Sequence, residues 1–314
     1  MKSLRFFLIG LGVTSLFCFG LNFSQAKLEG FLVSQWAVGP EVLTAEIPKK
    51  PAMAENDKPT NDFKVEAKSG LVLVLALDGS RKVVFDYNSD QKMPIASLTK
   101  LMTAVVSVES LPLSQKVVIS ETCVHQAGSA GDLKPGEKIA VRELLKMALV
   151  ESSNDAAEAL AEAYGREQFI ELMNLKAGEL GLGSTHFATP TGLEADSNFS
   201  TARDLTNLTL YIMDSHPLIM EISRQESLVV VSENETIHHR ALNTNELLAN
   251  FAEITNGELE IVGGKTGYTQ EAGGCIILVT KDNAGDYFVN VVLGSSSWES
   301  RFLEMEKLVK NFNQ

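Results

Sequence analysis

The sequence has 314 residues, of which 45% are hydrophobic and 21% charged, a composition that excludes a largely disordered chain. Its 27 basic and 40 acidic residues give a formal net charge of −13, which disfavours nucleic acid as a partner because phosphate backbones are repelled. Three cysteines are too few for a disulfide scaffold.

The first 26 residues have the pattern of an export signal. Lys2 and Arg5 precede an uncharged, mostly apolar stretch over 6–23, and Ala26 ends a small-x-small cleavage site. The stretch is also nearly long enough to span a bilayer, so an uncleaved N-terminal anchor remains the alternative. Both interpretations predict export to the periplasm or another extracytoplasmic cell-wall space, with membrane contact only through an uncleaved N-terminus.

Residues 27–66 are predicted to be a linker. Four of the nine prolines fall within twenty residues there, among polar side chains, and such sequence is semi-extended and buries little surface. The folded domain is therefore expected over 67–314. Of the three cysteines, Cys123 and Cys275 lie in this domain. A disulfide between them would suit an oxidising compartment, but we expect two buried, unpaired thiols.

The domain begins with a strand pattern. An apolar run over 71–77, the turn dipeptide Asp78-Gly79 and a second stretch over 82–87 predict a β-hairpin of buried strands. Apolar residues at three- and four-residue spacing after Pro94 predict a helix over 97–110. Later patterns predict helices over 141–150, 155–164, 168–180 and 298–312 and strands over 228–231, 261–267, 275–280 and 287–293. This order predicts one α/β (α+β) domain whose sheet uses both ends of the chain, with a mostly helical insertion between them.

The histidines do not indicate a catalytic triad or a metal site. The sequence contains neither a Gly-x-Ser-x-Gly elbow nor an HExxH motif. His238 and His239 are adjacent on an expected strand, so their side chains point to opposite faces and cannot chelate one ion together. All five histidines are interpreted as surface or structural residues.

A serine paired with a lysine is the alternative route to a nucleophile. Ser-x-x-Lys occurs three times, but only Ser97 and Lys100 open an apolar helix, where i and i+3 share a face. The Lys100 amine is therefore expected beneath Ser97 Oγ, and Leu101 and Met102 would help keep it neutral, as a base must be. Alone, this pattern fits an ordinary N-cap serine and a solvated lysine at least as well.

Two further motifs favour the catalytic interpretation of Ser97 and Lys100. Ser152-x-Asn154 lies in a loop that leads into a helix, and Lys265-Thr266-Gly267 leads into a strand with Gly273-Gly274 beyond. A strand this rich in glycine packs poorly unless another backbone approaches it closely. The three motifs, in this order, are those of penicillin-binding proteins and class A β-lactamases.

The chain closely resembles the serine-type D-Ala-D-Ala carboxypeptidases, the low-molecular-weight penicillin-binding proteins. The resemblance runs from about Gly70 to Phe312 and is carried by residues 93–103, 153–156, 173–174, 189–193, 200–204 and 265–269. It implies a β-lactamase/penicillin-binding-protein transpeptidase-like fold, with an antiparallel sheet flanked by helices and a mostly helical insertion. It implies neither a cofactor nor a metal.

The resemblance also implies catalytic roles. Ser97 would attack the carbonyl of the penultimate D-Ala of a peptidoglycan stem peptide, and Lys100 would accept its proton. Ser152 would relay a proton towards the leaving amine, and Asn154 would hold the substrate amide and the lysine. β-Lactam antibiotics would be trapped as acyl-enzymes.

Substrate-binding roles follow from the third motif. By resemblance, Lys265 and Thr266 would bind the terminal carboxylate, and Gly267 would let the substrate lie along the strand. Backbone N–H groups of Ser97 and Tyr268 would form the oxyanion hole.

Two departures from the family and three other activities complete the expectations. Because the sequence ends at Gln314, we expect neither the C-terminal β domain nor the C-terminal anchor of many relatives, and Thr191 stands where some relatives have histidine.

A D,D-endopeptidase would use the same residues. A β-lactamase needs a carboxylate to activate water, and Glu171, inside an amphipathic helix, is interpreted as a surface residue. A peptidoglycan or β-lactam sensor would need a transmembrane relay and a signalling domain, and we expect neither.

Overall fold

The computed structural model describes residues 63–124, 126–128, 131–193, 197–232 and 238–313. All of them belong to Lys58–Gln314, one of the two units into which the chain divides. The predicted export signal over 1–26, and the predicted linker as far as residue 62, lie outside the described residues. Within the described ranges, no helix has the length and apolar character needed to cross a membrane.

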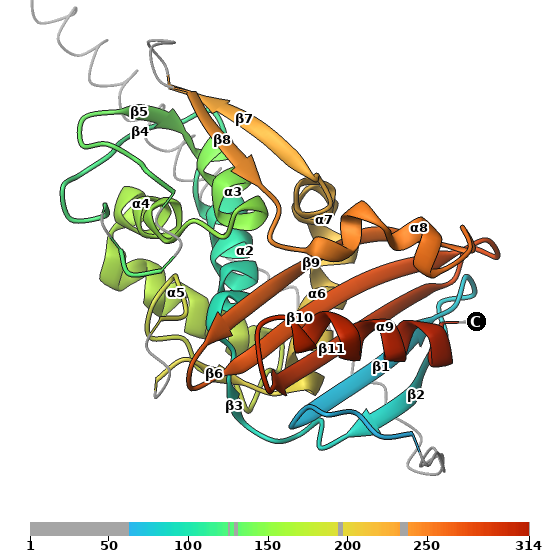
Figure 1. Ribbon diagram of the computed structural model, residues 1–314. Helices are drawn as coiled ribbons and strands as arrows, with labels where there is room; N and C mark the ends of the chain where they lie inside the picture. The colour runs from blue at the N-terminus through green and yellow to red at the C-terminus, as the bar shows by residue number, and fades with distance from the viewer. Residues whose placement is uncertain (1–62, 125, 129–130, 194–196, 233–237, 314) are drawn as a thin grey trace, which may run out of the picture. The chain divides into compact units, whose positions relative to one another are not determined.

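A five-stranded antiparallel sheet uses both ends of the domain, as expected (Figure 1). Its order is β2 (Arg81–Tyr87), β1 (Ser69–Leu75), β11 (Tyr287–Ser295), β10 (Gly273–Asp282) and β9 (Leu259–Thr269). The predicted N-terminal hairpin thus pairs directly with the last strand of the chain. Strand β9 lies at the edge of the sheet, opposite β2.

The segment between β2 and β9 is the mostly helical insertion predicted from the sequence. Its helices are α2 (Lys100–Ser110), α3 (Val141–Val150), α4 (Asn154–Tyr164), α5 (Arg166–Glu179), α6 (Ala202–Ser215), α7 (Pro217–Ser223) and α8 (Phe251–Ile254). Two 3₁₀ turns are η1 (Ala96–Thr99) and η2 (Glu246–Ala249). Short ladders pair β3 (Met93–Pro94) with β6 (Phe199–Ser200), β4 (Lys116–Val118) with β5 (Lys138–Ala140), and β7 (Ser227–Val231) with β8 (His238–Leu242). Helix α9 (Ser300–Phe312) follows the last strand.

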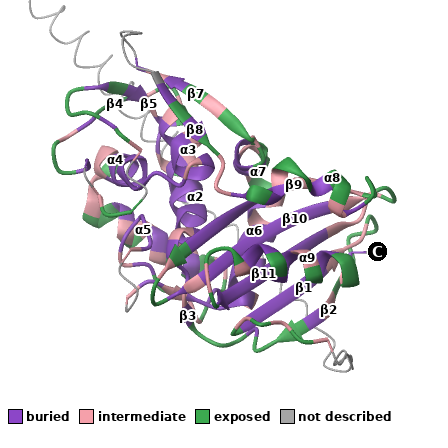
Figure 2. Cartoon of the chain, viewed as in Figure 1, coloured by how far each residue is buried: buried purple, intermediate pink, exposed green. Residues whose placement is uncertain are grey.

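Both faces of the sheet are covered, which explains its continuous apolar runs. Leu71 and Leu73 on β1 face the core that includes α2, whereas Val72 between them faces the core built on α9. Helices α6 and α7 lie against one face and α9 against the other. Figure 2 shows α2 and the middle strands buried along most of their length. Phe63, just before β1, adds an edge-on ring contact to Phe312 of α9, with centroids 5.2 Å apart.

Candidate active site

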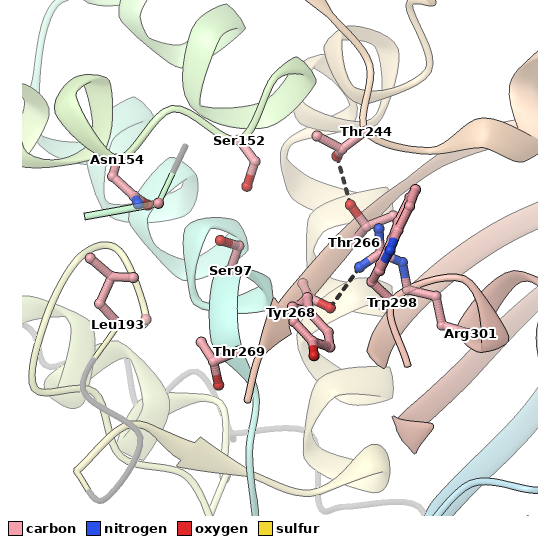
Figure 3. A pocket seen from close by; sticks show the side chains of 13 residues that line it. Ser97, Ser152, Asn154, Leu193, Thr244, Thr266, Tyr268, Thr269, Trp298 and Arg301 are labelled. Atoms are coloured by element: carbon pink, nitrogen blue, oxygen red, sulfur yellow. Dashed lines mark hydrogen bonds between the residues drawn. The ribbon is translucent and has the colours of Figure 1, made fainter. Parts of the chain in front are cut away.

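A cavity of about 400 Å³ lies between the helical insertion and strand β9 (Figure 3). It is lined by Ser97, Gly128, Ser152, Asn154, Gly192, Leu193, Thr244, Thr266, Gly267, Tyr268, Thr269, Trp298 and Arg301. Six of the eight residues singled out in the sequence are among them. The other two, Lys100 and Lys265, are buried and do not line the cavity.

Ser97 lies in the 3₁₀ turn η1, not in the α-helix predicted over 97–110, which begins at Lys100. In a 3₁₀ turn the side chains at i and i+3 are eclipsed, so the turn aligns Ser97 with Lys100. Ala96, just before the serine, has a φ of +47°, a strained backbone conformation of the kind found at active sites. Gly192 packs so closely on the Ala96 carbonyl that any Cβ there would clash, so only glycine at position 192 is compatible with this turn.

The Lys100 amine has the environment of a general base. Its Nζ lies 2.8 Å from Ser97 Oγ, 2.7 Å from Asn154 Oδ1 and 3.0 Å from the Thr191 carbonyl oxygen. Complete burial lowers the pKa of Lys100 to about 7, against a smaller opposing effect of the Glu158 carboxylate. A neutral amine has two hydrogens and one lone pair. With Asn154 and Thr191 accepting both hydrogens, the lone pair faces the Ser97 hydroxyl.

The start of helix α4 positions the second motif. Ser153 is the N-cap, and its Oγ accepts a hydrogen bond from Ala156 N at 3.1 Å. Ser152, before the cap, has a φ of +64°, and Asn154 is the first helical residue. Both side chains reach the cavity, where Figure 3 shows them on the same side as Ser97. Asn154 Nδ2 also donates to the Ala127 carbonyl at 2.6 Å, which ties the loop before β5 to the site.

The glycines of β9 and β10 allow the close backbone approach inferred from the sequence. A Cβ on Gly267 would lie 3.0 Å from both Ser97 N and the Ile95 carbonyl oxygen, so only glycine lets β9 pack on the η1 turn without displacement. On β10, Gly274 packs directly against the carbonyl of Ser297. These contacts bring the backbone of β9 beside Ser97, where an oxyanion hole would have to form.

Lys265 lies behind Thr266, away from the cavity surface. It is 2% exposed, and its Nζ donates to the Thr266 carbonyl at 3.1 Å. Burial, together with the positive charges of Lys100 and Arg301, holds its pKa well below the usual range. Thr266 itself does line the cavity, and its hydroxyl lies 2.6 Å from that of Thr244.

Arg301 is a cavity residue that the sequence analysis missed. It is 5% exposed, and its Nη1 donates to the Gly267 carbonyl at 3.0 Å, while its Nε is buried without a hydrogen-bond partner. Such a guanidinium can receive an anion in the cavity. A signal was present, because Arg301 stands four residues before Met305 and seven before Leu308, on the buried stripe of α9.

The remaining polar candidates have structural roles. His239 pairs with Glu137 at 2.7 Å, and His216 with Glu109 at 2.8 Å, as the structural interpretation of the histidines requires. His125 and the side chain of His238 lie outside the described part of the chain. Within that part, no cluster of three or more His, Cys, Asp or Glu could hold a metal ion. Two further interpretations are confirmed: Cys123 and Cys275 are buried free thiols, and Glu171 is exposed on α5.

A serine in contact with a buried lysine, beside a strand that can present backbone N–H groups, is the machinery of a serine hydrolase. Over residues 54–297 the sequence matches the family described as D-alanyl-D-alanine carboxypeptidase. The chain belongs to this family of serine peptidases, as the resemblance drawn from its motifs had implied.

Two curated relatives give the extent of the similarity. The D-alanyl-D-alanine carboxypeptidase DacF of Bacillus subtilis is 33% identical over 266 residues, which cover 82% of this chain and 65% of the relative. The D-alanyl-D-alanine endopeptidase of Pseudomonas aeruginosa is 39% identical over 235 residues, which cover 73% of this chain and 71% of the relative. The chain thus spans about two thirds of the length of each.

Solved structures share the fold. Penicillin-binding protein D2 from Listeria monocytogenes, in its ampicillin-bound form, is 29% identical and superposes with a TM-score of 0.68. The match covers 80% of this chain and 98% of that structure. The predicted fold, an antiparallel sheet flanked by helices of the penicillin-binding-protein type, is therefore confirmed.

Proposed function

We propose that the protein is a serine-type D-alanyl-D-alanine carboxypeptidase that removes the terminal D-Ala from peptidoglycan stem peptides. The observation that supports it most strongly is the Ser97–Lys100 pair, with its 2.8 Å contact between a hydroxyl and an amine whose pKa is about 7. Such a lysine can take a proton at neutral pH, which an ordinary, fully charged lysine cannot.

The reaction would pass through an ester on Ser97. As Ser97 Oγ attacks the carbonyl carbon of the penultimate residue, Lys100 takes the hydroxyl proton, and the carbonyl oxygen becomes an oxyanion held by the N–H groups of Ser97 and Tyr268. Collapse of this intermediate breaks the C–N bond, and Ser152 passes a proton to the leaving amine of D-Ala. Asn154 holds the substrate amide and the lysine. Water then hydrolyses the ester and regenerates Ser97.

The sheet side would bind the substrate. Its chain would add to the exposed edge of β9, where Gly267 leaves room, and its terminal carboxylate would meet Thr266 and Arg301. Lys265, behind Thr266, donates to the Thr266 carbonyl and would hold this part of β9 in position. β-Lactams carry a reactive carbonyl and a carboxylate in a similar arrangement, so they would acylate Ser97 as well.

Replacing the nucleophile tests this proposal. Ser97→Ala should abolish labelling by a fluorescent penicillin and the release of D-Ala from a pentapeptide ending in D-Ala-D-Ala. Ser107→Ala, on the following helix and outside the cavity, is the matched control and should keep both activities. Labelling that persisted in Ser97→Ala would show that another residue is the nucleophile.

Cleavage of peptide cross-links by the same residues is the second candidate function. It is favoured by the 39% identity to a D-alanyl-D-alanine endopeptidase over a similar share of both chains. A β-lactamase is less well supported, because among the described residues that line the cavity none carries a carboxylate to activate water. Rapid turnover of nitrocefin by the purified protein would contradict this ranking.

The proposed site of action is the cell wall. The sequence pattern of 1–26, either as a cleaved signal peptide or as an N-terminal anchor, would export the domain to the periplasm or another extracytoplasmic space. There the linker, predicted over 27–66 but reaching no further than residue 62 because Phe63 packs on Phe312 of α9, would hold the catalytic domain near its peptidoglycan substrate. Comparing the mass of the mature protein with that of the full chain would tell whether the segment is removed.

A further inference from the structure

Trp298 lines the cavity, and the reaction described above does not use it. Its indole is 42% exposed and lies at the end of the cavity where Thr266 and Arg301 are found (Figure 3). The guanidinium carbon of Arg301 is 5.9 Å from the centre of the Trp298 ring. A large aromatic side chain left half-open beside a cationic site marks a surface that a ligand can cover.

The backbone of Trp298 is held in place by the turn before α9. Ser297 N donates to Ser300 Oγ at 2.8 Å, and Ser300 N donates back to Ser297 Oγ at 3.1 Å. The Ser297 carbonyl rests on Gly274 of β10, where any larger residue would clash. The backbone that carries the indole is therefore fixed between a reciprocal cap and the sheet.

Its position relates it to one group of the substrate. In the proposed reaction the amine of the leaving residue is fixed by its bond to the carbonyl that Ser97 attacks. Its carboxylate is fixed by Thr266 and Arg301. The side chain of that residue is its one remaining substituent. A methyl group could cover only a small part of the exposed indole beside Arg301, whereas a longer aliphatic side chain could cover much more of it.

We propose that Trp298 selects the residue that the enzyme releases. Its indole packs on the aliphatic side chain of a diamino acid that keeps a free carboxylate beside the leaving amine, and so raises the cleavage of cross-linked peptides relative to that of peptides ending in D-Ala. The chemistry is unchanged: the ester forms on Ser97, the C–N bond to the diamino acid breaks, its amine gains the proton, and water frees the enzyme. This inference rests on the proposed function.

The test measures kcat/KM for two substrates, a muropeptide dimer cross-linked through such a diamino acid and a linear pentapeptide ending in D-Ala-D-Ala. In Trp298→Ala, the ratio of dimer to pentapeptide cleavage should fall by about tenfold or more, as expected when apolar contacts to a substrate side chain are lost. Trp298→Phe should restore part of the ratio. Tyr87→Ala, which removes an equally exposed aromatic residue outside the cavity, should leave it unchanged.

An unchanged ratio in Trp298→Ala, or a fall caused by faster pentapeptide cleavage alone, would overturn the inference. So would a wild-type protein that releases D-Ala but never cleaves the dimer, although the proposed function would then stand. A wild-type protein that cleaves neither substrate would overturn both. Labelling by fluorescent penicillin reports whether each variant is folded with an active Ser97. If Trp298→Ala is not labelled, the ratio of dimer to pentapeptide cleavage is measured in Trp298→Leu instead.

Discussion

The two sides of the cavity both bury a basic side chain, but only one side satisfies it. On the helical side, Lys100 has three hydrogen-bond partners around its amine. On the sheet side, the Nε of Arg301 is buried without a partner. The amine on the helical side has its partners before any substrate arrives, as proton transfer requires, whereas the guanidinium on the sheet side has not used its full hydrogen-bonding capacity.

The two buried lysines show the same difference. Lys100 and Lys265 both have lowered pKa values because of burial, yet only Lys100 contacts a nucleophile. Lys265 donates to the carbonyl of Thr266 within its own strand. Burial alone therefore does not make a catalytic base, since the amine must also touch the proton that it removes.

Removal of Lys100, the base on the helical side, should have the largest effect on the reaction. Lys100→Met keeps the length of the side chain and removes the amine, so the rate of acylation by penicillin should fall about 10³-fold, within the range for loss of a general base. The melting temperature should change little, because the gain from removing a buried amine is offset by the Asn154 oxygen and the Thr191 carbonyl, which lose their donor. Lys146→Met, a half-buried lysine paired with Glu143, is the control. Acylation within tenfold of the wild type would assign the base to another group.

Removal of the cation on the sheet side should have a smaller and more selective effect. Arg301→Gln should lower kcat/KM for a peptide with a free terminal carboxylate by about 10–100-fold, the value of a charged hydrogen bond. A matched peptide ending in an amide should lose much less, since it never makes the ion pair. Equal losses on both peptides would mean that Arg301 supports the fold of β9 through Gly267 and does not bind the substrate.

The fold was largely predictable from the sequence, because its signals are local. The central strands β1, β10 and β11 are largely apolar runs buried on both faces, and the helices have regular three- and four-residue spacing that ends at Gly165 and Gly181. The reactive pairing of Ser97 with Lys100 was accessible only together with the motifs at 152–154 and 265–267, because Ser-x-x-Lys by itself occurs three times in the sequence.

The remainder of the site depends on tertiary packing. The 3₁₀ turn at Ser97 contains the left-handed Ala96, for which Gly192, almost a hundred residues later in the chain, leaves room. Arg301 and Trp298 reach the cavity only because α9 and its preceding turn dock on β10, a contact that no local pattern encodes. The position of Lys265 behind Thr266 likewise follows from the register of β9.

The helical side should also respond to pH. The pKa of Lys100 is lowered to about 7, so below this pH the amine is an ammonium ion and cannot accept the Ser97 proton. The rate of acylation by penicillin should therefore rise with pH, about tenfold per unit below 7, and level off above it. Rates measured from pH 5 to 9 would check this rise with pH, which should be absent in Lys100→Met. A flat profile in the wild type would contradict the assignment.

Replacement of Glu151, next to Ser152, should have the smallest effect of the changes considered. This residue shows that not every buried polar group on the helical side has a hydrogen-bond partner. Burial, and the nearby negative charges of Asp132 and Asp155, raise the pKa of Glu151 to about 7, and its Oε1 is buried without a partner. Because the folded state then binds more protons than the unfolded state between about pH 4.5 and 7, stability should fall as pH rises through this window.

Glu151→Gln removes this titration, so its stability relative to the wild type should increase from pH 4.5 to 7 and then stay constant. We expect the melting temperature of the variant to exceed that of the wild type by about 2–4 °C at pH 8, and by less at pH 5. A constant difference in melting temperature between pH 5 and pH 8 would mean that the Glu151 carboxyl is solvated in the folded protein. A growing difference would show that the loop presenting Ser152 is held at a cost to stability, as expected of a segment shaped for catalysis.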